Sequence, residues 1–287
     1  MQLDLFADSR DVLLRNDAIA ALRVRNPSVA NAAYAKLAIE YPYDRFLKPL
    51  ATLLDSLDTS TSALTDVQTA TAALERMQLH QAAALQLFGA NEAQSWLAPL
   101  WRGLAERVAS LPFSAESPSV YSAAIWLQAQ NWAAAEVAVG TIPAWRRLPQ
   151  SLAWMAEARH AGQGLAVAWP LLVELAWLAP TRFVQLVPRL NTPVLARLLH
   201  SFQVDFDAEN GVDLAWFPAW ALVAEPGLAN VLRQSEATRG TPPERAFQLV
   251  LQLLDLERQG RHADLVECRK RLRDVHAGLF DSYMSTR

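Results

Sequence analysis

Apolar residues recur along the chain at the three- and four-residue spacing of amphipathic helices. Ala30, Tyr34, Leu37 and Tyr41, for example, fall on one helical face. The nearest candidate for a strand, residues 202–207, is short and rich in acidic residues. The pattern therefore predicts an all-α protein whose helices are joined by brief turns into hairpins.

Helix starts are predicted where a capping residue precedes proline. Such a side chain accepts a free backbone N–H, and proline needs no donor in the first helical turn. Capping boxes, with Gln or Glu three residues after the cap, are expected at Thr65 and Thr241. The cap-and-proline pairs are Asn26-Pro27, Ser117-Pro118, Thr192-Pro193 and Thr241-Pro242.

Two interruptions break the helical pattern. Residues 56–64 are rich in Ser and Thr, and residues 203–213 form an acidic stretch. Both are shorter than a usual interdomain linker, so we expect one helical domain over residues 1–287. The alternative is a subdivision into residues 1–55, 65–202 and 214–287.

Composition narrows the class of protein. Only 10 of the 287 residues are glycine, about half the usual ~7%, which counts against phosphate-binding glycine loops and β-rich folds. A net charge of −3 gives no overall positive potential that would attract nucleic acid, so no direct nucleic-acid partner is expected. The single cysteine, Cys268, excludes an internal disulfide and a multi-cysteine zinc site.

Membrane insertion and secretion are not expected. The most apolar stretch, residues 165–179, contains Pro170 and Glu174 and is shorter than the ~20 residues of a span, so we expect a buried helix. The N-terminus lacks the basic start and apolar core of a signal peptide. We therefore expect a cytoplasmic protein of bacterial type.

Small residues recur at matching places in hairpins about 33 residues apart. In residues 152–180 they are Ala156 on a first helix, Gly162 and Gly164 in the turn, and Ala168 on a second helix. Ala123, the turn at Asn131 and Ala135 take the same places one period earlier. The residues at 18–42 and 253–272 show related offsets.

This pattern resembles a degenerate tetratricopeptide repeat. The resemblance implies stacked antiparallel helical hairpins, an α-solenoid that offers a groove to a peptide or helix of another protein. Arg159 stands where the family has an aromatic residue, and residues 181–235 do not fit the register. The competing interpretation is a closed, non-repetitive helical bundle.

All ten tryptophans lie between residues 96 and 220. Tryptophan fills gaps between packed helices and also anchors partner peptides in grooves. We expect most of them to pack in the core. Trp126 and Trp132, together with Arg159, are candidate groove residues.

The sequence contains no catalytic or metal-binding pattern that can be assigned to a site. The histidines form no metal-ligand motif, Gly162-Gln163-Gly164 follows a helix and lacks a third glycine, and no nucleophile motif occurs. We predict no catalytic residue, cofactor or metal. A helical enzyme without a recognisable motif stays open as an alternative.

Residues 2–6 read Gln-Leu-Asp-Leu-Phe. They resemble the motif by which bacterial replication and repair proteins bind the sliding clamp. The resemblance implies polar contacts from Gln2, apolar anchors at Leu5 and Phe6, and support from Leu3. The alternative is that these apolar residues pack on the first helices.

The sequence thus favours a non-catalytic scaffold for protein–protein interaction. A replication or repair accessory protein docked on the clamp is the second hypothesis.

Overall fold

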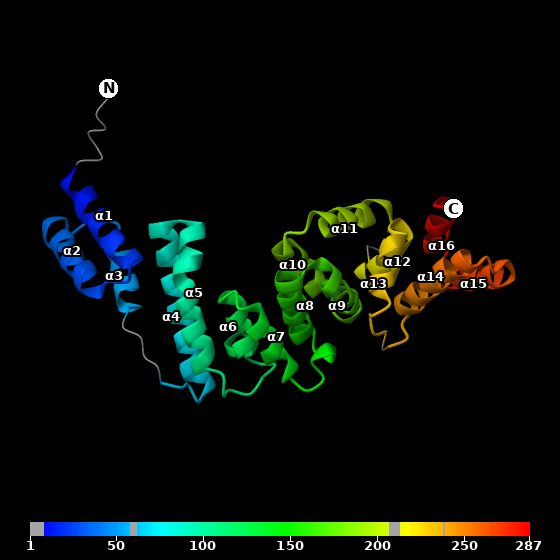
Figure 1. Ribbon diagram of the computed structural model, residues 1–287, viewed down its shortest axis with the longest axis horizontal. Helices are drawn as coiled ribbons and strands as arrows, with labels where there is room; N and C mark the ends of the chain where they lie inside the picture. The colour runs from blue at the N-terminus through cyan, green and yellow to red at the C-terminus, as the bar shows by residue number, and fades with distance from the viewer. Residues whose placement is uncertain (1–8, 58–61, 207–212, 238) are drawn as a thin grey trace, which may run out of the picture. The chain divides into compact units, whose positions relative to one another are not determined.

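The described part of the chain is entirely helical. The computed structural model describes residues 9–57, 62–206, 213–237 and 239–287, which form sixteen α-helices, four short 3-10 helices and no strand (Figure 1). The predicted all-α class is therefore confirmed. In chain order the α-helices are α1 (Arg10–Arg23), α2 (Pro27–Glu40), α3 (Leu47–Asp55), α4 (Val67–Phe88), α5 (Ala90–Arg107), α6 (Ser122–Gln128), α7 (Trp132–Gly140), α8 (Pro149–Gln163), α9 (Leu165–Leu178), α10 (Pro180–Leu190), α11 (Pro193–Asp205), α12 (Phe217–Ala224), α13 (Ala229–Leu232), α14 (Pro242–Gln259), α15 (His262–Val275) and α16 (Ala277–Ser285).

Helices that follow one another in sequence pack in pairs. The most extensive pairings are α1 with α2, α4 with α5, α8 with α9, and α14 with α15, and the long α4–α5 hairpin is plain in Figure 1. The predicted stacking of adjacent hairpins is confirmed. Membership of a repeat family stays a prediction.

The chain divides into two compact units, Met1–Ala135 and Glu136–Arg287. The division falls within α7 and not at the interruptions around residues 56–64 or 203–213. Each unit has a hydrophobic interior of its own and is described separately.

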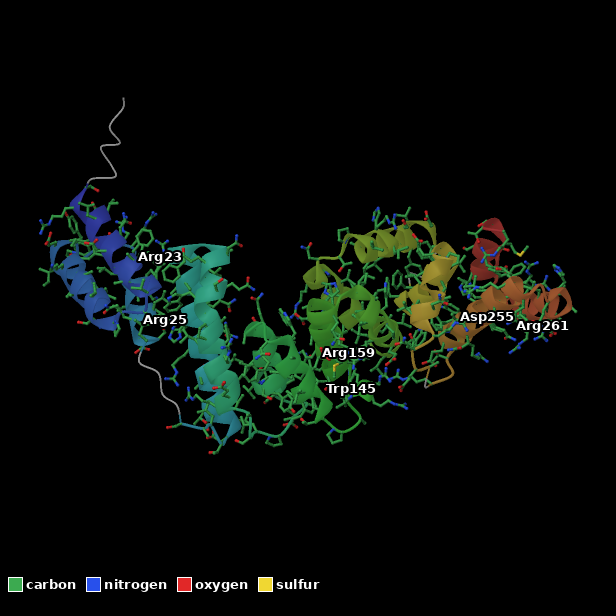
Figure 2. The ribbon with its side chains drawn as sticks, in the orientation of Figure 1. Arg23, Arg25, Trp145, Arg159, Asp255 and Arg261 are labelled. Atoms are coloured by element: carbon green, nitrogen blue, oxygen red, sulfur yellow. The ribbon has the colours of Figure 1, made fainter. Side chains whose placement is uncertain are left out.

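Within the first unit, side-chain contacts join the end of α1 to the start of α5. The indole Nε1 of Trp96, on α5, donates to the Leu22 carbonyl of α1 at 2.8 Å, and its ring meets Phe88 at 5.4 Å. The Arg25 guanidinium lies over that indole, 4.5 Å from the ring centroid, and Arg23 forms an ion pair with Glu92 at 2.6 Å (Figure 2). These contacts fix the end of α1 against the start of α5.

Helix α9 is the central element of the second unit. Every residue from Ala168 to Trp177 is buried, which confirms the buried helix expected for residues 165–179. Among the described helices, none combines the length and apolar character that crossing a bilayer requires. Beside α9, an aromatic cluster joins Phe183, Phe202 and Phe217, with ring centroids 5.4–5.7 Å apart.

Glycines end several helices in a conformation that other residues rarely adopt. Gly164, between α8 and α9, has φ of +92°, and Gly260, between α14 and α15, has φ of +66°. A residue without Cβ adopts these angles without steric cost. The turn at Gly164 lies where the sequence predicted it, whereas Gly162, expected in the same turn, lies within the last turn of α8.

The predicted helix caps have mixed outcomes. Asn26 accepts the Val29 N–H at 3.2 Å, and Thr241 forms the predicted capping box with Glu244. The box predicted at Thr65 is wrong: the cap is Asp66, whose carboxylate accepts the Thr69 N–H at 2.8 Å. The stronger anionic acceptor lies one residue later and sets the start of α4 there.

The other two cap-and-proline pairs start helical turns without side-chain capping. Ser117-Pro118 opens only a 3-10 helix (Pro118–Val120). Thr192 precedes α11, but its hydroxyl bonds the Leu190 carbonyl at 3.2 Å and His160 Nε2 at 2.8 Å.

Most tryptophans lie in the core, as predicted. Six of the ten are buried, and Trp126, Trp132, Trp145 and Trp216 are half-buried.

Candidate functional site

The residues of the clamp-like motif, Gln2, Leu3, Leu5 and Phe6, lie outside the described residues. The first described residue, Ser9, is the N-cap of α1. Arg10 at the start of α1 binds the Glu40 carboxylate of α2, with Nη2 2.7 Å from Oε1. The motif is therefore separated by only a few residues from an anchored helix.

None of the three groove candidates lines a cleft that is described below. Trp126 packs partly buried against the interior of the first unit, and Trp132 is the half-buried first residue of α7. Arg159 belongs to the second unit, where its Nε lies 3.5 Å from Glu136 Oε2 (Figure 2). Their role in partner binding stays a prediction.

A cleft lies in the first unit, between α3, α4 and α5. We call it the α4–α5 cleft; its volume is about 610 Å³. Ala73, Met77 and His80 line it from one face of α4, because residues four and three apart share a helical face. Pro99 and Gly103, one turn apart on α5, line the other side.

Small side chains explain why the α4–α5 cleft stays open. A Cβ built on Gly103 would meet no atom within 4 Å, so the space beside it is unfilled. Ala73 likewise leaves room across the cleft. Leu100 and Leu104 add apolar surface on α5.

Charged groups of both signs surround this apolar floor. Asp55 of α3, Arg76 of α4, and Glu106 and Arg107 of α5 all line the cleft. Arg107 also holds the rim: its Nε donates to the Ser62 carbonyl at 2.8 Å. The cleft thus combines an apolar floor with a mixed-charge rim.

His80 is the titratable group on the wall of the α4–α5 cleft. Burial lowers its pKa, Asp55 opposes this shift and Arg76 adds to it. Its buried Nδ1 has no hydrogen-bond partner among the described residues. Burial therefore favours the neutral imidazole, whose Nδ1 is an unused donor or acceptor.

The second unit contains a buried ionic cluster. Glu174, in the middle of α9, is only 6% exposed and accepts the Glu236 N–H at 2.9 Å. Arg146, in the 3-10 helix Trp145–Arg147, places its Nε 3.4 Å from Glu174 Oε2 and also pairs with the Glu236 carboxylate. Burial raises the pKa of Glu174 to about 7, against the opposing pull of nearby arginines led by Arg146.

A second buried carboxylate, Glu244, binds the loop between α13 and α14, to which Glu236 also belongs. Glu244, at the start of α14, is 2% exposed. Its Oε2 accepts the N–H groups of Arg239 and Thr241, both at 3.0 Å. A pocket of about 280 Å³ lies between the two glutamates and is lined by Arg146, Arg147 and Arg239 as well.

Sequence reasoning did not identify this ionic cluster. Glu174 was visible as a lone acid in an apolar run, which is the one signal that could have pointed to a buried, paired carboxylate. Its partners lie 28 residues before it and 62 residues after it, so local pattern could not supply them.

Two other reactive side chains, those of Cys268 and His276, make contacts that stabilise the fold. Cys268 is buried, its Sγ lies 3.7 Å from the Leu249 carbonyl oxygen, and burial raises the pKa of its thiol. His276 caps α16 by accepting the Leu279 N–H at 3.0 Å. Among the described residues, no group of three or more His, Cys, Asp or Glu is placed to hold a metal ion.

No family model, curated protein or solved structure matches this chain.

Proposed function

We propose that the protein is a non-catalytic adaptor that holds a segment of another protein against its helical hairpins. The observation that carries this proposal is the α4–α5 cleft, which combines an apolar floor with a charged rim.

The cleft suits an amphipathic segment of a partner protein. Such a helix inserts apolar side chains at three- and four-residue spacing into a groove and leaves its polar face outside. Met77, Leu100 and Leu104 supply the apolar contacts. Because the rim carries Asp55 and Glu106 as well as arginines, it selects the segment's orientation more than its net charge.

Gly103 offers a clean test of this proposal. Gly103→Leu fills the cleft, yet its backbone needs no positive φ and its Cβ meets open space. Leucine also favours the helix over glycine, by about 0.5–1 kcal/mol. Loss of a partner in this variant would therefore reflect a blocked cleft and not an unfolded protein.

The experiment compares partners co-purified from the native cell with wild-type protein, Gly103→Leu and two controls. Gly103→Ala keeps most of the cleft open, and Leu79→Glu changes an exposed residue of α4, 63% accessible, that does not line the cleft. A partner retained by both controls and lost with Gly103→Leu supports the proposal. A partner set identical in all four samples contradicts it.

A second function, docking on the sliding clamp, is supported by residues 2–6. All five positions agree with the clamp-binding pattern. Short segments of this kind bind pockets on partner proteins through a few apolar anchor side chains. Clamp docking would place the adaptor in DNA replication or repair, in the cytoplasm.

Purified clamp gives a direct test of the second function. Binding is measured by titrating clamp against the full chain and against a Leu5→Ala/Phe6→Ala double variant. We expect the double variant to bind at least about tenfold more weakly, because two buried anchors are removed. Equal binding by both proteins, or none by the wild type, would refute clamp docking.

A further inference from the structure

The first hairpin of the protein has an unusually apolar exposed face. Val24 at the end of α1 is 74% exposed, and Val29 at the start of α2 is 53% exposed. Together with Leu14, Ala20 and Ala32 they line a cavity of about 520 Å³ along the hairpin, which we call the α1–α2 groove.

This groove is not simply the margin of the interior. On α1 the core positions Ala18 and Leu22 lie within 40° of each other at 100° per residue, whereas Val24 lies 120–160° away from them. Ala21 and Leu14 lie between the core positions and Val24, because both line the groove while Ala21 belongs to the core and Leu14 packs against it. The hairpin therefore has one apolar face for its own unit and a second that its own unit leaves exposed.

Two charges of opposite sign stand in the α1–α2 groove, Asp17 on α1 and Lys36 on α2. Neither takes part in an ion pair among the described residues, whereas nearby charges do: Arg10 pairs with Glu40 and Arg15 with Asp44. The groove thus carries one unpaired acid and one unpaired base on separate helices.

We propose that a second copy of this chain covers the α1–α2 groove, in a symmetric dimer of N-terminal hairpins. A two-fold contact is self-complementary, so a group on α1 that meets α2 of the other copy is matched by the reciprocal contact. One acid and one base then give two ion pairs, Asp17 with the partner subunit's Lys36 and the reverse. Ala20 and Ala32 let the helices approach closely.

The size of the face determines how strong the dimer is. Each helix has 14 residues and is about 21 Å long at 1.5 Å per residue. Two helices 8–10 Å apart present roughly 400 Å² per copy. About 800 Å² in total is below the ~1,200–2,000 Å² of stable complexes, so the dimer is weak and depends on concentration.

The test is a charge reversal followed by its rescue, measured by sedimentation of the full chain across about a 100-fold range of concentration. The wild type is expected to show a monomer–dimer equilibrium. Asp17→Lys and Lys36→Asp each place like charges together and should weaken the dimer at least about tenfold. The double variant D17K/K36D restores both ion pairs and should recover an affinity within about threefold of wild type.

Two further samples make the result decisive. Val266→Lys changes a valine of α15 that is 69% exposed, and it should leave the equilibrium unchanged. A chain lacking residues 1–8 should dimerise like the full chain. Dimerisation that appears only in that shortened chain would make the N-terminal segment the occupant, and would overturn the proposal.

The proposal is also overturned by a wild type that is monomeric throughout, or by folded single variants that dimerise normally. Failure of the double variant to recover would equally exclude the reciprocal pairing. Thermal unfolding of each variant checks folding, and the exposure of Asp17 and Lys36 leads us to expect unchanged melting. None of these outcomes depends on the α4–α5 cleft or on clamp binding.

Discussion

The buried carboxylate of Glu174 should make the protein less stable as the pH rises through neutrality. The pKa of Glu174 is raised from 4.5 to about 7 in the folded protein, with burial as the main cause. In the unfolded chain the group ionises near its ordinary value. Between these two pKa values the folded state binds more protons than the unfolded state, so stability falls with increasing pH.

The size of the effect follows from the shift. A difference of about 2.5 pKa units at 1.36 kcal/mol each amounts to about 3 kcal/mol. The loss begins near pH 4.5 and is complete a little above pH 7. The shift already includes the attraction of Arg146, which favours the charged form.

Glu174→Gln isolates this contribution. The amide keeps the side-chain volume and an oxygen that can accept the Glu236 N–H, and Arg146 keeps Glu236 as its partner. We expect the variant and the wild type to have similar stability near pH 4.5. At pH 8 the variant should be more stable by about 3 kcal/mol.

Urea unfolding of both proteins from pH 4.5 to pH 8 measures this difference. Asp255→Asn is the matched control, because hydrogen bonding from Arg233 lowers the pKa of Asp255. The ionised Asp255 therefore stabilises the folded protein above its unfolded-state pKa, and this stabilisation is lost only as the pH falls through its folded-state pKa. The difference in unfolding free energy between Asp255→Asn and the wild type should thus stay flat from pH 4.5 to pH 8. A Glu174→Gln difference that is equally flat would refute the reasoning.

Three further changes test the local structure by urea or thermal unfolding. Gly103→Ala should stabilise the protein by about 0.5–1 kcal/mol, because alanine favours a helix interior and its Cβ meets no atom within 4 Å; a destabilised variant would contradict this. Gly164→Ala should destabilise it by about 1 kcal/mol, since φ is +92°, and an unchanged midpoint would argue against a strained turn. Trp96→Phe should cost about 1–3 kcal/mol by removing a buried hydrogen bond to α1, and a neutral result would show that this bond does not hold α1 to α5.

Local chemistry was enough to predict the all-helical class and several of the helix ends. Gly164 and Gly260 end helices because few other residues adopt their backbone angles. The cap at Asn26 follows from a side chain that bonds three residues ahead. The displaced cap at Asp66 shows the limit of such reasoning, because two neighbouring side chains compete and the carboxylate is the stronger acceptor.

The candidate sites could not be predicted in the same way. The α4–α5 cleft arises where Gly103 and Ala73 lie near each other on different helices. The burial of Glu174 depends on Arg146 and Glu236, which are remote in sequence. Such features depend on packing between elements, which the apolar period of one helix does not determine.

The loop between α13 and α14 is bound at two places by the buried carboxylates of Glu174 in α9 and Glu244 in α14. Glu174 takes the N–H of Glu236, and Glu244 takes the N–H of Arg239, three positions later. Surface loops usually tolerate insertion, but an added residue between Glu236 and Arg239 would change the spacing between the two N–H groups that the buried carboxylates accept. Homologous chains, when aligned, should therefore keep the length of this loop constant even where its sequence changes.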